Sequence, residues 1–366
     1  MGTIIACIGG FLGAGKTTAL QAAAAEIERR GKVAAVITND QGSELVDTQA
    51  MRSRGVDTAE ITGGCFCCKF EDLVSTMAAI VERRRPDVIL AEAVGSCTDL
   101  SATVYQPLRK FYPDTFTLAP LSILAEPSRV QALRNGGSGF PDSVRYLFGK
   151  QLAEADLIVL NKIDTLEAGD RRDITRWLHE AGAGAPVHAM SARSNVGVAE
   201  WVDRLVNGGS AGSRLLDIDY DTYAAAEAVL GWLNATVELT ASRDFPPQAV
   251  AERFIERVRQ MAADAGLAIA HVKAMVGAGA DSDRIALTDE TVAPQWSGTG
   301  RFAPASRMAL VINARMRAEP EELKRLIRDA LQASAEDFTL TTEVRHLECF
   351  SPARPTPRHR FAEIVE

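Results

Sequence analysis

The chain has little cysteine and little histidine, with six and five residues respectively among 366. Six cysteines are too few for a disulfide scaffold, so we expect a cytoplasmic, reducing setting in which clustered thiols bind metals or react with oxidants. The chain also lacks an excess of positive charge. Its formal net charge of -8 at pH 7 argues against a broad surface for nucleic acid.

Long apolar runs are missing as well, and we therefore expect no membrane partner. The apolar start of the chain lacks the basic residues of a signal peptide and leads directly into a glycine loop, so we interpret it as a buried strand. With 46% hydrophobic and 24% charged residues, the composition is that of a globular protein long enough for two domains.

A phosphate-binding pattern opens the chain. An apolar run over residues 4–8 predicts a buried strand, and a Gly-x-x-x-x-Gly-Lys-Thr loop and a run of strong helix formers follow it. Backbone N–H groups of such a loop, with the helix N-terminus behind them, bind phosphates. Lys16 would reach the β- and γ-phosphates, and the Thr17 hydroxyl would bind Mg²⁺. The predicted phosphate-binding residues are Gly10, Gly13, Ala14, Gly15, Lys16, Thr17 and Thr18.

A second pattern predicts the base. A buried strand over residues 155–160 is followed by Asn161-Lys162-Ile163-Asp164. The Asp164 carboxylate can accept hydrogen bonds from guanine N1 and N2, where adenine offers no matching donors. Asn161 would contact the ring edge, and the stem of Lys162 would cover the base face. A backbone N–H of the later pair Ser191-Ala192 would contact the guanine O6. The predicted nucleotide is GTP or GDP.

Two further loops are expected to respond to the γ-phosphate. Residues 86–91 predict a strand that ends at Glu92, whose carboxylate would hold Mg²⁺ through water, and Gly95 lets the backbone approach the phosphate. The polar loop at Asp40, after a strand over residues 33–38, is of the kind that moves with nucleotide state. Asp40 and Asp47 are alternatively solvated loop acids. The candidate catalytic residues are Lys16, Glu92 and Asp40.

Three of the six cysteines lie within four positions, at Cys65, Cys67 and Cys68. Two glycines precede them and a helix is expected from Glu71, so we expect thiols with lowered pKa values near a helix N-terminus. Three thiolates can hold one soft metal ion and leave a fourth position open, unlike a closed structural zinc site. Redox switching and simple core packing are the alternatives. Cys97 is a structural thiol or a fourth ligand.

These motifs together resemble the CobW-like P-loop GTPases, a family of proposed metallochaperones that shares its class with the accessory GTPases of nickel enzymes. The resemblance covers roughly the first 200 residues. This chain has Asn39-Asp40 where the family usually has Asn-Glu, and Ala93-Val94 where it has two threonines. Many members also carry a histidine-rich stretch, which is missing here.

The resemblance implies a P-loop α/β fold with a doubly wound, mostly parallel sheet, and an enzyme that hydrolyses GTP to GDP and phosphate. It also implies that a transition metal is held at Cys65, Cys67 and Cys68 in a nucleotide-dependent way and delivered to a client metalloprotein. Thiolates favour Zn²⁺, although Co²⁺, Ni²⁺ and Fe²⁺ also fit such ligands. The rivals are a regulatory GTPase with redox-sensing thiols and a small-molecule kinase. A homo-oligomer is compatible with the sequence as well.

Beyond residue 212 the elements alternate as in a β-α-β-β-α-β unit, which predicts a smaller ferredoxin-like α+β domain. The expected organisation is a GTPase domain over residues 1–206, a linker over 207–228, the second domain over 229–350 and a tail over 351–366. The tail is rich in proline and arginine, which indicates a disordered segment or a contact arm. Cys7 is expected in the core, and His346 with Cys349 is too weak a pattern for a site.

Overall fold

A computed structural model describes the chain except residues 1, 42–56, 136–140, 210, 290–291 and 366. Asp47 therefore lies outside the described residues. The described residues form two compact units. Unit 1 comprises residues 2–41, 57–226 and 354–365, and unit 2 comprises residues 227–353.

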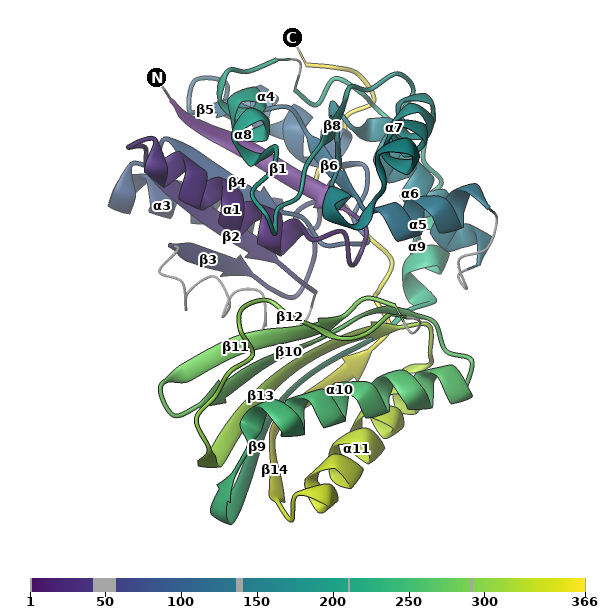
Figure 1. Ribbon diagram of the computed structural model, residues 1–366. Coiled ribbons are helices and arrows are strands. Elements are labelled where there is room, and N and C mark those ends of the chain that lie inside the picture. The colour runs from purple at the N-terminus through teal and green to yellow at the C-terminus, as the bar shows by residue number, and fades with distance from the viewer. Residues whose placement is uncertain (1, 42–56, 136–140, 210, 290–291, 366) are drawn as a thin grey trace. The chain divides into compact units, whose positions relative to one another are not determined.

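Unit 1 is built on an eight-stranded sheet in which all the pairings are parallel (Figure 1). Its strand order is β3-β2-β4-β1-β6-β7-β8, with β5 paired to β1. The predicted apolar runs form these strands because each is buried on both faces of the sheet. The strands are β1 (Thr3–Gly10), β2 (Ala34–Asn39), β3 (Thr58–Ile61), β4 (Val88–Glu92), β5 (Phe116–Leu118), β6 (Ser122–Ala125), β7 (Leu157–Leu160) and β8 (Val187–Ala189).

Helices follow most of these strands, as parallel crossovers require. Gly31, with φ 74°, lies just beyond the first helix, where glycine commonly ends a helix. The helices are α1 (Lys16–Arg29), α3 (Phe70–Arg84), α4 (Gln106–Phe111), α5 (Pro127–Arg134), α6 (Asp142–Glu154), α7 (Ala168–Ala181), α8 (Val198–Val206) and α9 (Tyr220–Ala228), with a π-helical turn at Ser101–Tyr105 and a 3-10 turn at Ile163–Thr165.

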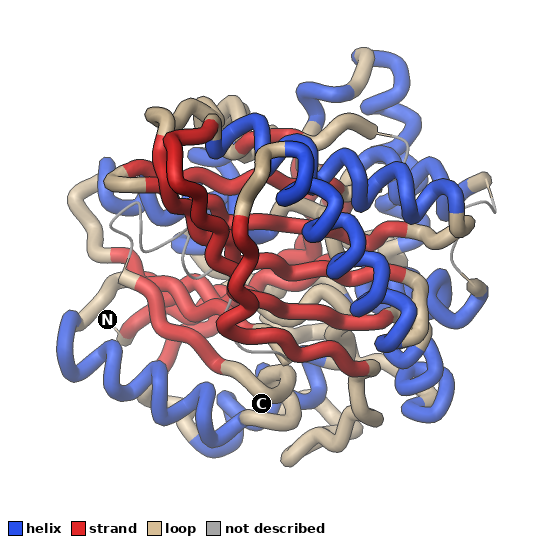
Figure 2. The backbone as a smooth tube through the Cα atoms, turned by 90° about the horizontal axis from the view of Figure 1, so that it is seen from below, coloured by secondary structure: helices blue, strands red, loops and turns tan. Residues whose placement is uncertain are grey.

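Unit 2 is an antiparallel sheet with two helices, and it has the predicted ferredoxin-like topology. Its sheet order is β12-β11-β10-β13-β9-β14, so the four strands of the β-α-β-β-α-β unit lie in the order β10-β13-β9-β14. Its elements are β9 (Gly231–Phe245), α10 (Pro247–Asp264), β10 (Ile269–Ala278), β11 (Asp281–Leu287), β12 (Gln295–Trp296), β13 (Ala305–Met316), α11 (Pro320–Asp337) and β14 (Thr341–Phe350). Figure 2 shows the strands and helices of both units along the tube.

The core of unit 2 lies between its sheet and its helices. Alternate residues of β9, among them Leu233 and Val237, pack with Phe254 of α10 and Leu331 of α11 in one buried apolar cluster. The period of two along the strand fits the pleat of a sheet with one face on the helices. The predicted fold class, a P-loop α/β domain followed by a smaller α+β domain, is thus confirmed.

Two segments that the composition marks as linker and tail have defined contacts in unit 1. The backbone N–H groups of Gly212 and Ser213 both donate to the buried carboxylate of Asp156, at 2.6 and 3.0 Å. Residues 354–365 run along unit 1, so the expectation of a contact arm describes the tail. Among the described residues, no helix has both the length and the apolar character that a membrane crossing needs.

Candidate functional site

The glycine-rich loop joins β1 to α1 at the carboxyl edge of the sheet. Gly10, Gly13 and Gly15 have φ values of 126°, 85° and 85°, a region that favours glycine. A Cβ at Gly10 would lie 2.3 Å from the carbonyl oxygen of Leu124, so the loop has no room for a side chain there. The loop therefore turns its backbone toward the N-terminus of α1, which is the geometry of a phosphate site.

The charged and hydroxyl groups of this loop are buried against it. The Lys16 ammonium donates to the carbonyl oxygens of Gly10 and Phe11, at 2.7 and 3.3 Å. The Thr17 hydroxyl donates to Glu92 Oε1 at 3.3 Å, and both side chains are buried. A hydroxyl and a carboxylate in contact beside a phosphate loop fit the ligands that Mg²⁺ takes in such sites. Ala14 lies in the loop before α1, and Thr18 lies in the first turn of α1.

The predicted base-binding residues lie next to the phosphate loop. The Asn161 amide donates to the Ala14 carbonyl oxygen and accepts from the Ala192 backbone N–H, both at 3.0 Å. A Cβ at Gly15 would lie 2.6 Å from Asn161 Nδ2, so the two loops are closely packed. Asn161 thus links the phosphate loop to the Ser191-Ala192 loop through these two hydrogen bonds. From the sequence, Asn161 was expected to contact the edge of the guanine ring.

The remaining residues of this motif are more open. Asp164 lies in the 3-10 turn and is exposed, which leaves its carboxylate accessible to a base. Lys162 has φ 59° and its ammonium lies 3.8 Å from the Glu126 carboxylate. Ser191 is buried, and its backbone N–H donates to the Val196 carbonyl oxygen at 2.9 Å.

The turn after β4 packs directly on the phosphate loop. A Cβ at Gly95 would lie 2.4 Å from Leu12 Cδ2 and 3.2 Å from the Leu12 backbone nitrogen, so only glycine allows this approach. The buried amide of Gln151, on α6, donates to the carbonyl oxygens of Gly95 and Cys97 at 3.0 and 2.8 Å. Gln151 was not identified from the sequence. It holds the turn that carries both Gly95 and Cys97.

The three clustered cysteines are brought together at the end of β3. Their sulfur atoms all lie within 4.8 Å of one another. The Sγ–Sγ distances are 2.8 Å for Cys65–Cys67, 3.4 Å for Cys65–Cys68 and 3.7 Å for Cys67–Cys68. Cys65 and Cys67 are buried and Cys68 is half-buried. Three convergent sulfurs with one accessible edge are a suitable donor set for a soft or borderline metal ion.

The expected lowering of the thiol pKa values is wrong for two of these residues. The pKa of Cys67 lies well above the ordinary value because its thiol hydrogen-bonds to Cys65, Cys68 and Cys97 and is buried. The pKa of Cys68 is raised mainly by its hydrogen bond with Cys65. Each sulfur lies against the other sulfurs and not against a cation, so a thiolate formed here would be next to groups of like charge. This effect raises the pKa by more than the N-terminus of α3 lowers it. The contact with Cys67 places Cys97 beside the cluster.

Asn39, at the end of β2, holds the cysteine loop. Its amide donates to the carbonyl oxygens of Ile61 and Gly64 at 3.0 and 2.7 Å, and accepts from the Phe66 backbone N–H at 3.1 Å. Sequence reasoning placed Asn39 in a nucleotide-responsive loop but missed this contact. The next residue, Asp40, is half-buried, and its backbone N–H donates to Ile61. Asp40 therefore lies beside the end of β3, which leads into the cysteine loop.

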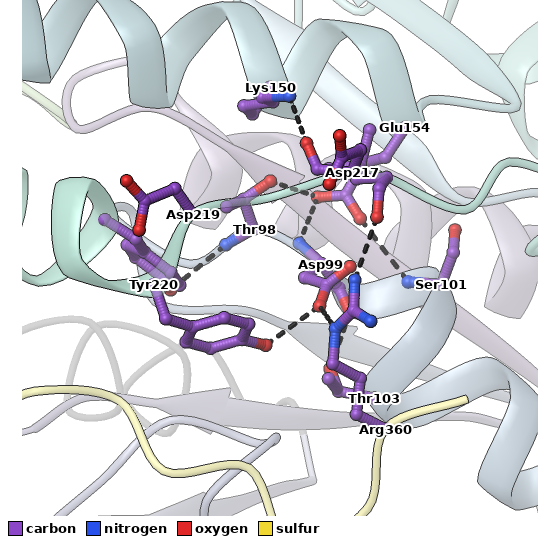
Figure 3. A network of polar contacts seen from close by, with 12 residues as sticks. Thr98, Asp99, Ser101, Thr103, Lys150, Glu154, Asp217, Asp219, Tyr220 and Arg360 are labelled. Atoms are coloured by element: carbon purple, nitrogen blue, oxygen red, sulfur yellow. Dashed lines mark hydrogen bonds and ion pairs between the residues drawn. The ribbon is translucent and has the colours of Figure 1, made fainter. Parts of the chain in front are cut away.

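A buried polar network follows Cys97 (Figure 3). The Glu154 carboxylate accepts from the Thr98 hydroxyl at 2.9 Å and from the backbone N–H groups of Asp99 and Ser101 at 3.1 and 3.4 Å. The buried Asp99 carboxylate accepts from the Tyr220 hydroxyl at 2.8 Å. Burial raises the pKa of Glu154 to about 8, and the nearby Asp99 charge acts in the same direction. Burial therefore favours the protonated form of Glu154 at neutral pH.

Cys7, Cys349 and His346 make other contacts. Cys7 is fully buried in β1, where burial raises its pKa to about 12. Cys349 in β14 donates to the Pro320 carbonyl oxygen at 3.1 Å, and His346 lies 3.9 Å from Glu348. Among the described residues, Cys65, Cys67 and Cys68 form a group of three potential metal ligands whose sulfur atoms all lie within 4.8 Å of one another.

Comparison with known proteins finds one family whose profile matches residues 4–189, described as "CobW/HypB/UreG, nucleotide-binding domain". The chain is 32% identical over 182 residues to the zinc chaperone CobW of Sinorhizobium sp, a match that covers 44% of this chain and 51% of that protein. It is 41% identical over 185 residues to the zinc chaperone YjiA of Escherichia coli (strain K12), covering 50% of this chain and 55% of that protein. The chain thus spans about half the length of the curated relatives it matches.

Among solved structures, HypB from Helicobacter pylori in complex with nickel matches with a TM-score of 0.41 and 16% identity. The match covers 56% of this chain and 86% of that structure.

The raised pKa of Glu154 gives this network a pH dependence. Between the ordinary value of 4.5 and about 8 the folded chain holds a proton that the unfolded chain releases, so stability falls as pH rises. Glu154→Gln should therefore flatten the decline of the urea unfolding midpoint between pH 5 and pH 8. The largest effect of the group is about 1.4 kcal/mol per pH unit. The exposed Glu82→Gln is the matched control. Parallel midpoint curves for the parent and Glu154→Gln would show that Glu154 is ionised throughout.

Proposed function

The chain belongs to the CobW/HypB/UreG family of nucleotide-binding P-loop proteins, and from this membership we propose that it is a GTP-hydrolysing metallochaperone. It would hold a divalent transition metal at Cys65, Cys67 and Cys68 and deliver it to a client metalloprotein in a reducing, cytoplasmic setting. The observation that carries the proposal is the convergence of three sulfurs within 4.8 Å, beside the strand ends of a P-loop fold.

The nucleotide half of the proposal is hydrolysis of GTP to GDP and phosphate. The backbone of the phosphate loop and the Lys16 ammonium would bind the β- and γ-phosphates, and Thr17 with Glu92 would hold Mg²⁺. The Asp164 carboxylate would accept from guanine N1 and N2, which gives a preference for GTP over ATP. Gly95 lies against the phosphate loop, where its backbone would sense the γ-phosphate. Asp40 would be the third catalytic residue, beside Lys16 and Glu92.

The metal half of the proposal rests on the donor set. Sulfur ligands favour Zn²⁺ among the abundant divalent ions, and Co²⁺, Ni²⁺ or Fe²⁺ would occupy the same ligands when available. The metal ion is the cargo in this proposal. A site with three ligands and an open fourth position would let the ion pass to a client. Cys97, which contacts Cys67, would supply a fourth sulfur when the turn after Gly95 moves toward the cluster.

The two halves would be coupled through the strand ends. Asn39 clamps the cysteine loop and precedes the loop that would respond to nucleotide, so a change at Asp40 would pass to the sulfurs through one residue. Coupling of this kind is reciprocal, because nucleotide must change metal affinity by the same factor as metal changes nucleotide affinity.

The competing function is a regulatory GTPase that senses oxidation through the same thiols. The Cys65–Cys67 contact alone would suit a disulfide. A third sulfur within reach of both favours metal, because a disulfide uses two thiols and leaves the third without a role.

Asp164→Ala should abolish the preference for guanine, because the acceptor for guanine N1 and N2 is lost. GTP binding should weaken by roughly 30- to 1,000-fold, measured by calorimetry with GTP and with ATP. Asp170→Ala removes the same charge from another exposed aspartate and is the control. An Asp164→Ala variant that still prefers GTP as strongly as the parent would overturn the assignment of the base.

Replacement of Cys65, Cys67 and Cys68 together by serine should eliminate tight Zn²⁺ binding, because a neutral hydroxyl is a poor ligand for this ion. GTP binding should persist, since none of the three contacts the phosphate loop. The bound Zn²⁺ is measured by equilibrium dialysis under reducing conditions. Cys349→Ser, a half-buried thiol of unit 2, is the matched control and should leave binding unchanged. Zinc bound by the triple variant as tightly as by the parent would place the ligands elsewhere.

A further inference from the structure

The last residues of the chain form an extended segment along unit 1, here called the strap, residues 354–365. Its first part lies on the cysteine loop. The Thr356 backbone N–H donates to Cys68 Sγ at 3.3 Å, and the Arg358 backbone N–H donates to the Cys67 carbonyl oxygen at 2.9 Å. The strap therefore contacts the one thiol of the cluster that is only half-buried.

Side chains of the strap extend this contact along the start of α3. The Arg358 guanidinium pairs with the Glu71 carboxylate at 3.2 Å. The His359 ring packs edge-on against Phe70, with ring centroids 5.3 Å apart, and lies 5.0 Å from the ring of Phe111. Glu71 and Phe70 begin the helix that follows the cysteines, so the strap covers the loop and its helix together.

The second part of the strap is anchored in the network that follows Cys97 (Figure 3). The Arg360 guanidinium donates to Asp99 Oδ2 at 2.7 Å and to the Leu216 carbonyl oxygen at 2.8 Å. The Asp99 side chain is 1% exposed and that of Arg360 is 34% exposed, so loss of the pair would leave a buried carboxylate without its cation. The Phe361 backbone N–H donates to the Ala102 carbonyl oxygen at 3.1 Å. The yellow end of the chain in Figure 1 follows this path.

We propose that the strap is a latch that covers the metal site and is fastened to the turn that follows the nucleotide-sensing residue Gly95. Its opening would expose Cys68 and let a client approach the metal. The consequence of this opening, which is transfer of the metal to a client, rests on the proposed function. The covering of Cys68 by the strap is a separate property and can be tested without metal or nucleotide.

The contacts explain why nucleotide would act on the latch. Asp99, which binds Arg360, is four residues beyond Gly95, and the segment between them is held by Gln151 and Glu154 of α6. A displacement of this segment by the γ-phosphate would move Asp99 away from Arg360. The strap would then lose its buried anchor while the contacts at the cysteine loop, which are largely exposed, provide little to retain it.

The test compares the reactivity of Cys68 in the parent and in strap variants. Reduced, metal-free protein is treated with a maleimide, and labelling of Cys68 is followed by peptide mass mapping. Arg358→Ala with Arg360→Ala should increase the labelling rate about tenfold, because opening of the strap becomes more frequent. Arg354→Ala removes the same charge from the same segment, but its partner Asp221 belongs to α9 and not to the cysteine loop or the turn after Gly95. This control should label at the parental rate.

A second variant distinguishes opening of the strap from unfolding of the protein. Arg360→Lys keeps the positive charge beside Asp99 but removes the guanidinium hydrogen bonds, so it should fold normally and should label faster than the control. A peptide of residues 354–366 should restore slow labelling in a chain that ends at residue 353. Equal rates in the parent, the double variant and the shortened chain would overturn the latch.

Transfer of Zn²⁺ from the protein to a chromophoric chelator extends the test to function. The double variant should release Zn²⁺ about tenfold faster than the Arg354→Ala control, in line with its thiol reactivity. If the parent binds no metal but its Cys68 is protected by the strap, the chaperone function fails and the latch stands. If Zn²⁺ is bound yet its release is the same in all variants, the latch does not control transfer.

Discussion

The site depends on one constraint, which is that every strand of the unit 1 sheet runs in the same direction. The carboxyl ends of β1, β2, β3 and β4 therefore meet at one edge, and each bears a different functional group. β1 ends in the phosphate loop, β2 in Asn39, β3 in the cysteine loop and β4 in Glu92. Crevices at the carboxyl ends of open parallel sheets are where ligands bind in such folds. The cysteine cluster and the phosphate loop are neighbours here because the parallel topology brings the carboxyl ends of both strands to the same edge.

Close packing makes these neighbours mechanically dependent on one another. Gly95 is in contact with the phosphate loop, and Asn161 joins that loop to the Ser191-Ala192 loop. Asn39 joins the strand edge to the cysteine loop through three hydrogen bonds. Packed interiors respond to a local change by switching between discrete arrangements and not by yielding gradually. A phosphate bound or lost at the loop would therefore be transmitted to the sulfurs through few residues.

The strands, the loop glycines and the cysteine cluster could be predicted because each has a local signal. Buried strands show as apolar runs, and the positive φ values of Gly10, Gly13 and Gly15 follow from the motif. Asn39, Gln151 and Glu154 could not be found in this way, because what they bind is set by tertiary packing. The pKa values of Cys67 and Cys68 were predicted in the wrong direction, since a helix start is visible in the sequence and mutual contact of thiols is not. The strap was assigned from composition, which cannot show that Arg360 has a buried partner.

In the proposed function, nucleotide state changes the affinity of the cysteine cluster for metal. The most direct measurement is a Zn²⁺ titration of the same protein sample with GDP and with a non-hydrolysable GTP analogue, under reducing conditions and against a chelator of known affinity. The account predicts that the two dissociation constants differ by about 5- to 150-fold, the usual range for coupled sites. It also predicts that Zn²⁺ changes the affinity for the GTP analogue relative to GDP by the same factor. Identical zinc affinities in the two nucleotide states would contradict it.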